Sequence, residues 1–523
     1  MTILLTSHSA RRLAATLAAA VPLLLAPAAL ADPGIVKAPA IPGVAALPGP
    51  FADPGKPAAD LKVMKTTPDI GVPGTATTFS ASGLPAGKAV TLVWQTATVD
   101  WMLDPRADSV DYLGRKTTKT TVALATATTD ASGNLSLKLK APQDFGGIHE
   151  VYAVADGVQV AKGGFLVARS ASISPKRGPI GTPITVTYSG LGSSLYEGGG
   201  SLLYDNKYVG AVMANWTRGV ARVKIRATGR PGKHSIEIAD AITFKYLNLE
   251  QSPVPWATGF EFDFTVTKDN GRPAPRIDWP AEIVPTVTSK TTLDAAGLGA
   301  STSATAALSA TSGQVLTKVD LSAAGLVPDV PVSLEWATVV GNRVNCTGTC
   351  WSFVTVPIGT GVATADGTLK TNVTVPDGLG GWHTVQLKQA GVVKAQVPFY
   401  VKRSIVGNGV SSLTLKRGQH FTVHLKGLGW TQLDNTIAVD YDNSYVGYGC
   451  GFNSNGDVVM NLTATGEPGT HLIDMYPLLY TQQPSYANTP YGMVPVLSYE
   501  KDAPGLALGY QLPAIRLAIT IVK

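Results

Sequence analysis

The chain has 523 residues, of which 45% are hydrophobic and 15% charged, and its formal net charge at pH 7 is +6. This length exceeds what a single hydrophobic core supports and suits about four domains of roughly 100 residues each. The low charge content excludes a disordered polyelectrolyte, and the small, dispersed positive balance excludes the clustered basic surface that nucleic-acid binding requires.

Residues 1–31 have the features of an export signal. Arg11 and Arg12 form a positive region, an apolar run covers 13–25, and Ala29 and Ala31 give the small-x-small form of a cleavage site. A membrane anchor fits less well, because prolines interrupt the run and it is short for a bilayer span. Removing this segment takes away two of the 42 basic residues against 36 acidic ones, which leaves a net charge of +4.

The signal predicts a secreted or extracellular protein, free or associated with the cell surface, exported by the general secretory or the twin-arginine route. Residues 32–60 are rich in Pro, Ala and Gly and predict a flexible spacer. A first domain follows at 61–169, with alternating apolar residues at 77–81, 90–94 and 135–139. This period of two predicts strands with one face in a core and the other in water.

A second domain is predicted at 170–269, followed by a linker at 270–313 that is rich in Pro, Ala, Ser and Thr. A third domain is predicted at 314–403 and a fourth at 404–523. No segment shows a sustained 3.6-residue apolar period with caps, so we expect an all-β protein of four tandem immunoglobulin-like sandwiches. We call these predicted domains the first to fourth repeats.

The second and fourth repeats match at a fixed offset of 237, with ten identities in the twenty-five positions of 186–210 and 423–447. The first and third repeats match through Trp94 and Trp336 and through the Gly-x-His strands of both. Self-similarity at a fixed period is typical of repeat architectures. The sequence therefore predicts a two-domain unit that was duplicated within the chain.

A Gly-x-His motif at the start of a predicted strand occurs once in each repeat. The four histidines are His149, His234, His383 and His471. Metal ligands must converge within a few ångströms, whereas one histidine per domain places these far apart. We therefore expect each imidazole to hydrogen-bond to nearby backbone, the corner role that tyrosine has in other sandwiches, and we expect no metal site and no cofactor.

The repeats resemble the bacterial immunoglobulin-like families, in particular the IPT/TIG-type tandem repeats of exported proteins. The resemblance depends on Gly-Thr-Pro-Ile-Thr-Val at 181–186, on Gly190 with Leu191, and on the Pro-Gly-x-His strand. Trp94 and Trp336 lie where such sandwiches often bury an aromatic residue on a central strand. The resemblance implies a spacer, adhesive or ligand-binding role and specifies the fold rather than an activity.

Three cysteines remain after the signal. Cys346 and Cys350 could close a tight disulfide across a glycine turn, or they could be half of a metal site that lacks a second pair of ligands. Cys450 aligns with Met213 of the second repeat, which predicts a buried apolar position and an inert thiol.

Long segments inserted into the sandwiches at 97–119, 246–256, 339–361 and 476–497 are predicted to carry any binding surface, because a scaffold positions its loops for function. Exposed aromatic residues beside polar groups suit contact with sugars or peptides. The candidate binding residues are Trp101, Arg106, Tyr112, Trp256, Trp351, Tyr480 and Tyr486. The alternative is that these segments only cover the edges of the sheets.

The sequence favours a non-catalytic binding or spacer protein of the cell envelope or extracellular space, with a glycan or protein partner and no nucleic acid. One alternative is a carbohydrate-active hydrolase that uses Asp100, Asp104 and Asp108, since paired carboxylates serve glycoside hydrolysis. Another is a surface-layer component that assembles through sheet edges. No nucleophile elbow, zinc-protease helix or nucleotide-binding loop is present in the sequence, so we expect no enzyme activity.

Overall fold

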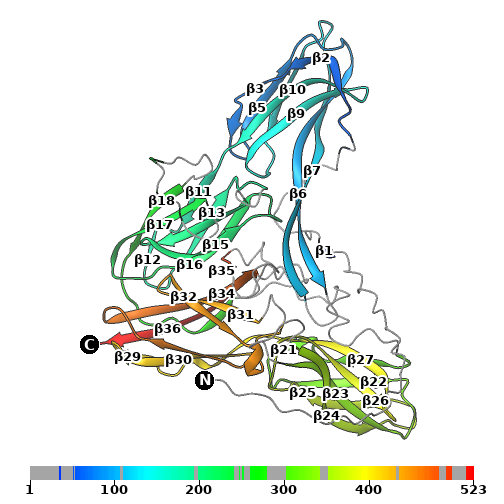
Figure 1. Cartoon of the computed structure of the whole chain (residues 1–523), viewed down its shortest axis with the longest axis vertical. Helices are drawn as coiled ribbons and strands as arrows, with labels where there is room; N and C mark the ends of the chain where they lie inside the picture. Colours follow the sequence, from blue (N-terminus) through cyan, green and yellow to red (C-terminus); the bar gives the residue numbers. More distant parts are fainter. Residues whose placement is uncertain are drawn as a thin grey trace, which may run out of the picture. The chain divides into compact units, whose positions relative to one another are not determined.

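The computed structural model describes residues 34–36, 51, 53–105, 110–193, 198–240, 245, 247, 250–251, 259–278, 302–341, 351–430, 435–481, 491–497 and 514–523. The predicted export signal lies outside these residues. Regular structure within them consists of β-strands and one 3-10 turn, Phe452–Ser454. The prediction of an all-β protein built from several β-sandwiches is confirmed, and Figure 1 shows the separate sheets.

The first repeat contains two sheets that share a hydrophobic core. The smaller sheet consists of β3 (Lys65–Thr67), β5 (Ala76–Ala81) and β8 (Leu135–Lys140). The larger has the order β1 (Gly34–Val36), β6 (Ala89–Pro105), β9 (Gly147–Ala155), β10 (Val158–Val167) and β2 (Pro57–Val63), with β4 (Ile70–Gly71) beside β10 and β7 (Val110–Thr128) beside β6. Val90, Leu92 and Trp94 alternate along β6 and lie in the core, as a period of two requires.

The second repeat has the same two-sheet plan. Its smaller sheet consists of β11 (Ser170–Ser174), β13 (Pro183–Ser189) and β16 (Val220–Arg226). Its larger sheet has the order β12 (Arg177–Gly178), β18 (Gly259–Val266), β17 (Gly232–Asp240), β14 (Gly199–Tyr204) and β15 (Lys207–Met213). β15 and β16 therefore lie at the ends of their sheets.

The third repeat pairs β20 (Thr305–Leu308), β22 (Lys318–Ala324) and β25 (Leu369–Thr374) in its smaller sheet. Its larger sheet has the order β21 (Ser312–Gly313), β27 (Val392–Val401), β26 (Gly381–Gln389), β23 (Pro331–Gly341) and β24 (Trp351–Val362). Its core includes Trp336 and Phe399, at the positions of Trp94 and Phe165 in the first repeat.

The fourth repeat has a smaller sheet of β28 (Ser404–Val410), β30 (His420–Lys426) and β33 (Val458–Thr463). Its larger sheet has the order β19 (Arg276–Asp278), β36 (Ala514–Val522), β34 (Gly469–Thr481), β31 (Thr436–Tyr441) and β32 (Ser444–Cys450), with β29 (Thr414–Lys416) beside β36 and β35 (Tyr491–Pro495) beside β34. The orders β36-β34-β31-β32 and β18-β17-β14-β15 correspond, so the second and fourth repeats share one topology.

The Gly-Leu pairs at 190–191 and 427–428 lie where the two repeats of each half meet. The amide of Gly146 donates to the carbonyl of Leu191 at 2.8 Å, and the amide of Gly380 donates to the carbonyl of Leu428, also at 2.8 Å. A Cβ atom on Gly146 would collide with the carbonyl oxygen of Gly190. Glycine is therefore required by the close approach of two backbones, and the same junction occurs in both halves.

The predicted spacer and linker contain strands that the composition did not indicate. β1 and the start of β2 fall within 32–60, and β19, β20 and β21 fall within 270–313. β19 pairs with β36, more than two hundred residues later in the chain. Short strands at sheet edges tolerate proline and depend on distant partners, so local composition does not distinguish them from linkers.

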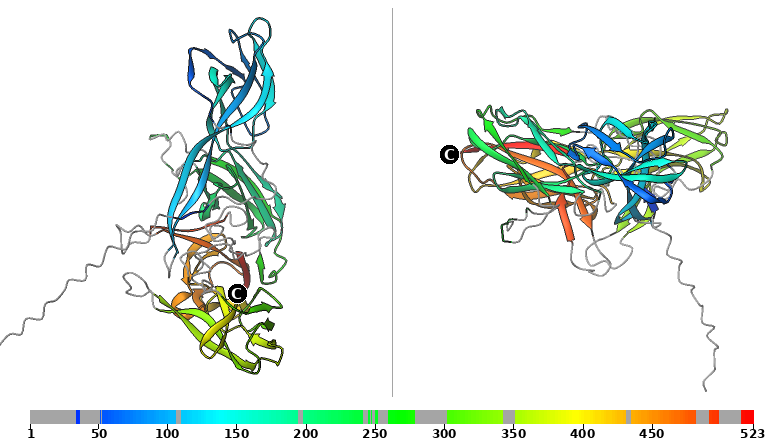
Figure 2. Two further views of the ribbon diagram at one scale, coloured as in Figure 1. Left: turned by 90° about the vertical axis from the view of Figure 1, so that its right-hand side faces the viewer. Right: turned by 90° about the horizontal axis from the view of Figure 1, so that it is seen from above.

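Three of the four segments predicted as inserted loops instead contain extended strands. β6 and β7 pair continuously from Ala89 with Thr128 to Pro105 with Val110, and they form the long cyan hairpin in Figure 1 and Figure 2. Segment 339–361 contributes to β23 and β24, and segment 476–497 to β34 and β35. Threonine and valine continue the strand pattern through these segments, and both favour β-structure. Most of segment 246–256 lies outside the described residues.

Candidate functional site

The four repeated histidines make one common contact, to the carbonyl oxygen of the residue four positions earlier. The Nε2 atoms of His149, His234, His383 and His471 lie 2.7, 2.8, 2.9 and 2.7 Å from the carbonyl oxygens of Phe145, Arg230, Leu379 and Glu467, respectively. Each imidazole therefore closes the turn that precedes its own strand. The described residues contain no group of three His, Cys, Asp or Glu side chains placed to hold a metal ion.

The second ring nitrogen separates the histidines into two types. In the first repeat, Nδ1 of His149 lies 2.7 Å from the carbonyl oxygen of Gln95, and the ring stacks on Trp94 with centroids 4.4 Å apart. In the second repeat, Nδ1 of His234 lies 2.7 Å from the carboxylate of Asp205, a turn residue with φ of 50°. The third and fourth repeats reproduce these two arrangements with Trp336 and Asp442.

The pKa values of His383 and His471 are shifted in opposite directions. Burial lowers the pKa of His383 to about 4, although carbonyl oxygens at both ring nitrogens favour the charged form. Burial would also lower the pKa of His471, but the hydrogen bond and charge of Asp442 outweigh it, so this pKa is raised. Both ring nitrogens of each imidazole therefore already have a hydrogen-bonding partner within the protein.

Most candidate binding residues lie where the structure does not describe their side chains. Trp101 and Tyr112 belong to β6 and β7, and Tyr480 belongs to β34. Arg106, Trp256, Tyr486, Cys346 and Cys350 lie outside the described residues. Trp351 does not fit the prediction of an exposed aromatic residue, because it is only 7% exposed and packs against Phe452.

Two of the three carboxylates proposed for the hydrolase alternative belong to a strand and not to a loop. Asp100 and Asp104 belong to β6, and Asp108 lies outside the described residues. Asp100 is buried, and it pairs across the hairpin with Lys116 of β7. Asp104 pairs with Asp111 across the same hairpin.

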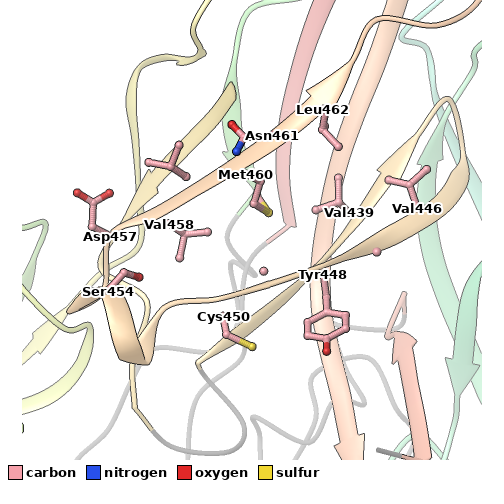
Figure 3. A pocket seen from close by; sticks show the side chains of 13 residues that line it. Val439, Val446, Tyr448, Cys450, Ser454, Asp457, Val458, Met460, Asn461 and Leu462 are labelled. Atoms are coloured by element: carbon pink, nitrogen blue, oxygen red, sulfur yellow. The ribbon is translucent and has the colours of Figure 1, made fainter. Parts of the chain in front are cut away.

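A groove of about 730 Å³ lies between β32 and β33 of the fourth repeat, and we call it the edge groove. Figure 3 shows its lining, with Tyr448 and Cys450 on β32 and Met460 and Leu462 on β33. Each of these strands ends its sheet, and no further strand among the described residues pairs with it. The edge groove is therefore the open side of the sandwich, where the two sheets separate.

β32 has glycine at a position that faces β33, and the side chain of Met460 lies against it. Gly449 pairs with Ile437 of β31, and a Cβ atom on Gly449 would lie 2.7 Å from Sδ of Met460. The equivalent residue of the second repeat is Val212, which is fully buried in the core of that repeat. Met460 and Leu462 are half-buried, whereas their counterparts Val223 and Ile225 are fully buried.

The rim of the edge groove presents apolar side chains to solvent. Val446 is 52% exposed and Tyr448 is 48% exposed, although both belong to a strand. Cys450 also lies on this rim and is exposed, so the prediction of a buried thiol is wrong. Its counterpart Met213 is buried in the hydrophobic cluster that also contains Val494, Val496 and Leu497.

The equivalent edge of the second repeat is covered by a segment of the fourth. Val496 forms a parallel bridge with Ala211 of β15, and the amide of Leu497 donates to the carbonyl of Ala211 at 2.8 Å. Val494, Val496 and Leu497 are buried in the same hydrophobic cluster as β15. Among the described residues, a segment therefore pairs with this edge in the second repeat, whereas none pairs with the equivalent edge in the fourth.

A buried charged cluster joins these two repeats. Arg226 of β16 donates from Nε to Asp474 of β34 at 3.1 Å, and Arg516 of β36 donates to the same carboxylate at 3.0 Å. Arg516 also donates to Asp278 of β19 at 2.5 Å. The two guanidinium groups are thus balanced by two carboxylates, as burial of charge requires.

Sequence reasoning did not find the edge groove, although the repeat alignment contains its signal. Gly449 replaces Val212, and Thr463 replaces Arg226, at the offset of 237 that relates the two repeats. Glycine within a strand often marks a place where a neighbouring group approaches the backbone closely, and here that group is the side chain of Met460. Only the structure shows that, among the described residues, no strand pairs with the outer edge of β32.

No family model matches the chain, and no curated protein matches it. Among solved structures, the chain is similar to FdeC, an Escherichia coli adhesin, at 12% identity over 68% of this chain and 99% of that chain, with a TM-score of 0.15. It is also similar to a Corynebacterium diphtheriae protein described as membrane anchored, at 11% identity over 88% of this chain and 91% of that chain, with a TM-score of 0.17. A red sea bream transglutaminase matches at 12% identity over 40% of this chain and 31% of that chain, with a TM-score of 0.15.

TM-scores this low carry no argument about fold or function, and membership of the IPT/TIG-type families stays a prediction. In the part of the chain that the structure describes, no helix is long and apolar enough to span a bilayer. The case for a function therefore depends on the edge groove itself.

Proposed function

We propose that this protein is an exported, non-catalytic binding protein whose ligand occupies the edge groove of the fourth repeat. The observation that carries the proposal is the contrast between two equivalent edges. β15 is covered by residues 494–497, whereas β32 exposes Val446 and Tyr448 beside a groove of about 730 Å³. Exposed apolar side chains beside a groove support an interaction site.

The chemistry of the edge groove supports binding rather than catalysis. Its carboxylate, Asp457, lies 2.5 Å from Nε2 of His424 and 3.8 Å from Nζ of Lys426, so its oxygen atoms already contact neighbouring side chains. The cysteine on the rim is exposed on an edge strand, and no histidine lines the groove to activate it. The hydrolase alternative gains no support from the described positions of Asp100 and Asp104.

The proposal is tested with the full chain and two glycine variants. Gly449→Val places in the fourth repeat the residue that the second repeat has at the same position. Gly164→Val is the matched control, because Gly164 lies in β10 of the first repeat and a Cβ atom there makes only ordinary contacts, the nearest at 3.5 Å. Binding is measured to an immobilised unfolded polypeptide and to envelope polysaccharide.

The parent and Gly164→Val should bind one of these two immobilised ligands with equal affinity. Gly449→Val should bind the same ligand at least ~10-fold more weakly, a loss of about 1.4 kcal/mol in binding free energy. Equal retention by all three proteins would contradict the assignment of the groove. Release of reducing sugar from the polysaccharide by the parent would contradict a non-catalytic role.

A further inference from the structure

We infer that the ligand of the edge groove is an extended, uncharged segment of another protein, which adds to β32 as a parallel strand. This inference rests on the proposed function, and it specifies the chemical class of the ligand and the way in which the ligand is held.

The backbone of β32 supplies the first argument. A strand at the end of a sheet has unpaired N–H and C=O groups, and adding a strand to such an edge is a recurring mode of peptide recognition. β32 pairs with β31 on one side, and its other side has no partner strand among the described residues. Edge hydrogen bonds to a new strand would satisfy these groups.

The lining of the groove supplies the second argument. Its lining combines Gly447, Gly449 and the apolar side chains of Val458, Met460 and Leu462 with the polar side chains of Ser454, Asp457 and Asn461. Figure 3 shows the side chain of Met460 between the two strands. Alternate side chains of an added strand point to the same face, so every second residue of the ligand would contact Val458, Met460 and Leu462.

The second repeat supplies a precedent within the same chain. Residues 494–497 lie along β15, where Leu497 donates its amide to the carbonyl of Ala211. The equivalent of Ala211 in β32 is Tyr448. Both residues pair with the preceding strand in the same register, Ala211 with Ser201 and Tyr448 with Ala438. The carbonyl of Tyr448 is therefore the acceptor that a parallel strand would use.

Two observations favour a different protein over a second copy of this chain as the ligand. The segment that fits such an edge, 494–497, is already engaged with β15 of its own chain. The ion pair that accompanies this contact also has no counterpart, because Thr463 stands where the second repeat has Arg226. If a second copy docked at the edge groove, the fourth repeat would therefore offer no arginine to pair with the Asp474 of that copy.

The probe is a synthetic peptide with the sequence of residues 491–498, Tyr-Gly-Met-Val-Pro-Val-Leu-Ser, carrying fluorescein at its N-terminus. Its binding to the full chain is followed by fluorescence anisotropy. A second peptide is identical except for N-methylation of the leucine amide, which removes the donor equivalent to Leu497 N–H and keeps the side chains. Sedimentation velocity of the parent, from low to high concentration, is measured in parallel.

The peptide should bind the parent and Gly164→Val alike and should bind Gly449→Val at least ~10-fold more weakly. N-methylation should weaken binding about 5- to 10-fold, the loss expected for one backbone hydrogen bond. If Gly449→Val does not fold, Met460→Lys replaces it, because a half-buried lysine can reach solvent while its charge opposes an apolar ligand. The parent should sediment as one species at all concentrations.

Equal affinity for the two peptides would overturn strand addition, since side-chain contacts alone would then explain binding. Self-association that Gly449→Val abolishes would overturn the choice of a different protein, and a second copy would be the ligand. Polysaccharide binding that depends on Gly449, without peptide binding, would overturn this inference while the proposed function stands. If neither ligand depends on Gly449, both fail.

Discussion

The guanidinium group of Arg226 and the carboxylate of Asp474 form a buried ion pair between the second and fourth repeats. Arg226 is 5% exposed and Asp474 is 2% exposed, and 248 positions separate them in the sequence. Arg226 also donates to the carbonyl of Leu517 at 2.8 Å, and its own carbonyl accepts from Asn443 at 2.8 Å. This contact accompanies the covered edge of the second repeat.

Replacing Arg226 should destabilise the second and fourth repeats together. Arg226→Ala leaves Asp474 buried with one of its two arginine partners removed, and loss of one member of a buried pair typically costs about 3–5 kcal/mol. Denaturant unfolding followed by tryptophan fluorescence measures the change. Thr463→Ala, at the equivalent exposed position of the fourth repeat, is the control and should change stability by less than ~0.5 kcal/mol. Similar effects of the two substitutions on the free energy of unfolding would contradict a stabilising role for the buried Arg226–Asp474 ion pair.

Asp440 should keep its proton to a higher pH than an ordinary aspartate does. It is 0% exposed, and neither carboxyl oxygen has a hydrogen-bond partner among the described residues. Burial and the charge of Asp474 raise its pKa well above the ordinary value, although Arg516 opposes the shift. The folded state therefore retains a proton that the unfolded state loses, so this residue's contribution to stability falls as the pH rises above about 4.

Asp440→Asn should abolish that loss, because an amide of the same shape does not ionise. Melting temperatures of the parent and the variant are compared from pH 4 to pH 9. The parent should lose stability relative to Asp440→Asn as the pH rises. Parallel profiles over this range would show that Asp440 does not titrate differently in the folded and unfolded states.

His383 should make the third repeat sensitive to acid. Its pKa of about 4 lies below the ordinary value of 6.5, because burial disfavours the charged ring. The unfolded state therefore binds a proton that the folded state does not, and stability falls as the pH is lowered from 6.5 to 4, by about 3 kcal/mol in total. Unfolding free energies of the parent and His383→Gln at pH 7 and pH 4.5 measure this term. An equal acid loss in both proteins would contradict it.

The corner histidines of the second and fourth repeats should stabilise their own repeats. His234→Ala removes contacts to the carbonyl of Arg230 and the carboxylate of Asp205, and His471→Ala removes the equivalent pair. Each substitution should cost roughly 1–3 kcal/mol. Differential scanning calorimetry of the two variants and the parent checks this. His420→Ala, at an exposed position of β30, is the control. Unchanged melting temperatures of His234→Ala and His471→Ala would contradict a stabilising role for these two histidines.

Strand content could be predicted from the sequence, because alternation along a strand is a local property. Val90, Leu92 and Trp94 alternate in the sequence and lie in the core of the first repeat. Segment 97–119 was predicted as a loop, although its threonine and valine residues continue the strand pattern into a hairpin. A long interval between motifs does not by itself indicate irregular structure.

The repeats and their all-β character were determined by the sequence alone, since strand period, turn residues and internal identity are written in consecutive positions. Which edge is covered and which is open was decided only by tertiary structure. Gly449 and Val212 occupy equivalent places in one blueprint, yet the edge beside Val212 receives residues 494–497 from a distant part of the chain. Pairing across such separations depends on how whole repeats pack, and no local pattern encodes it.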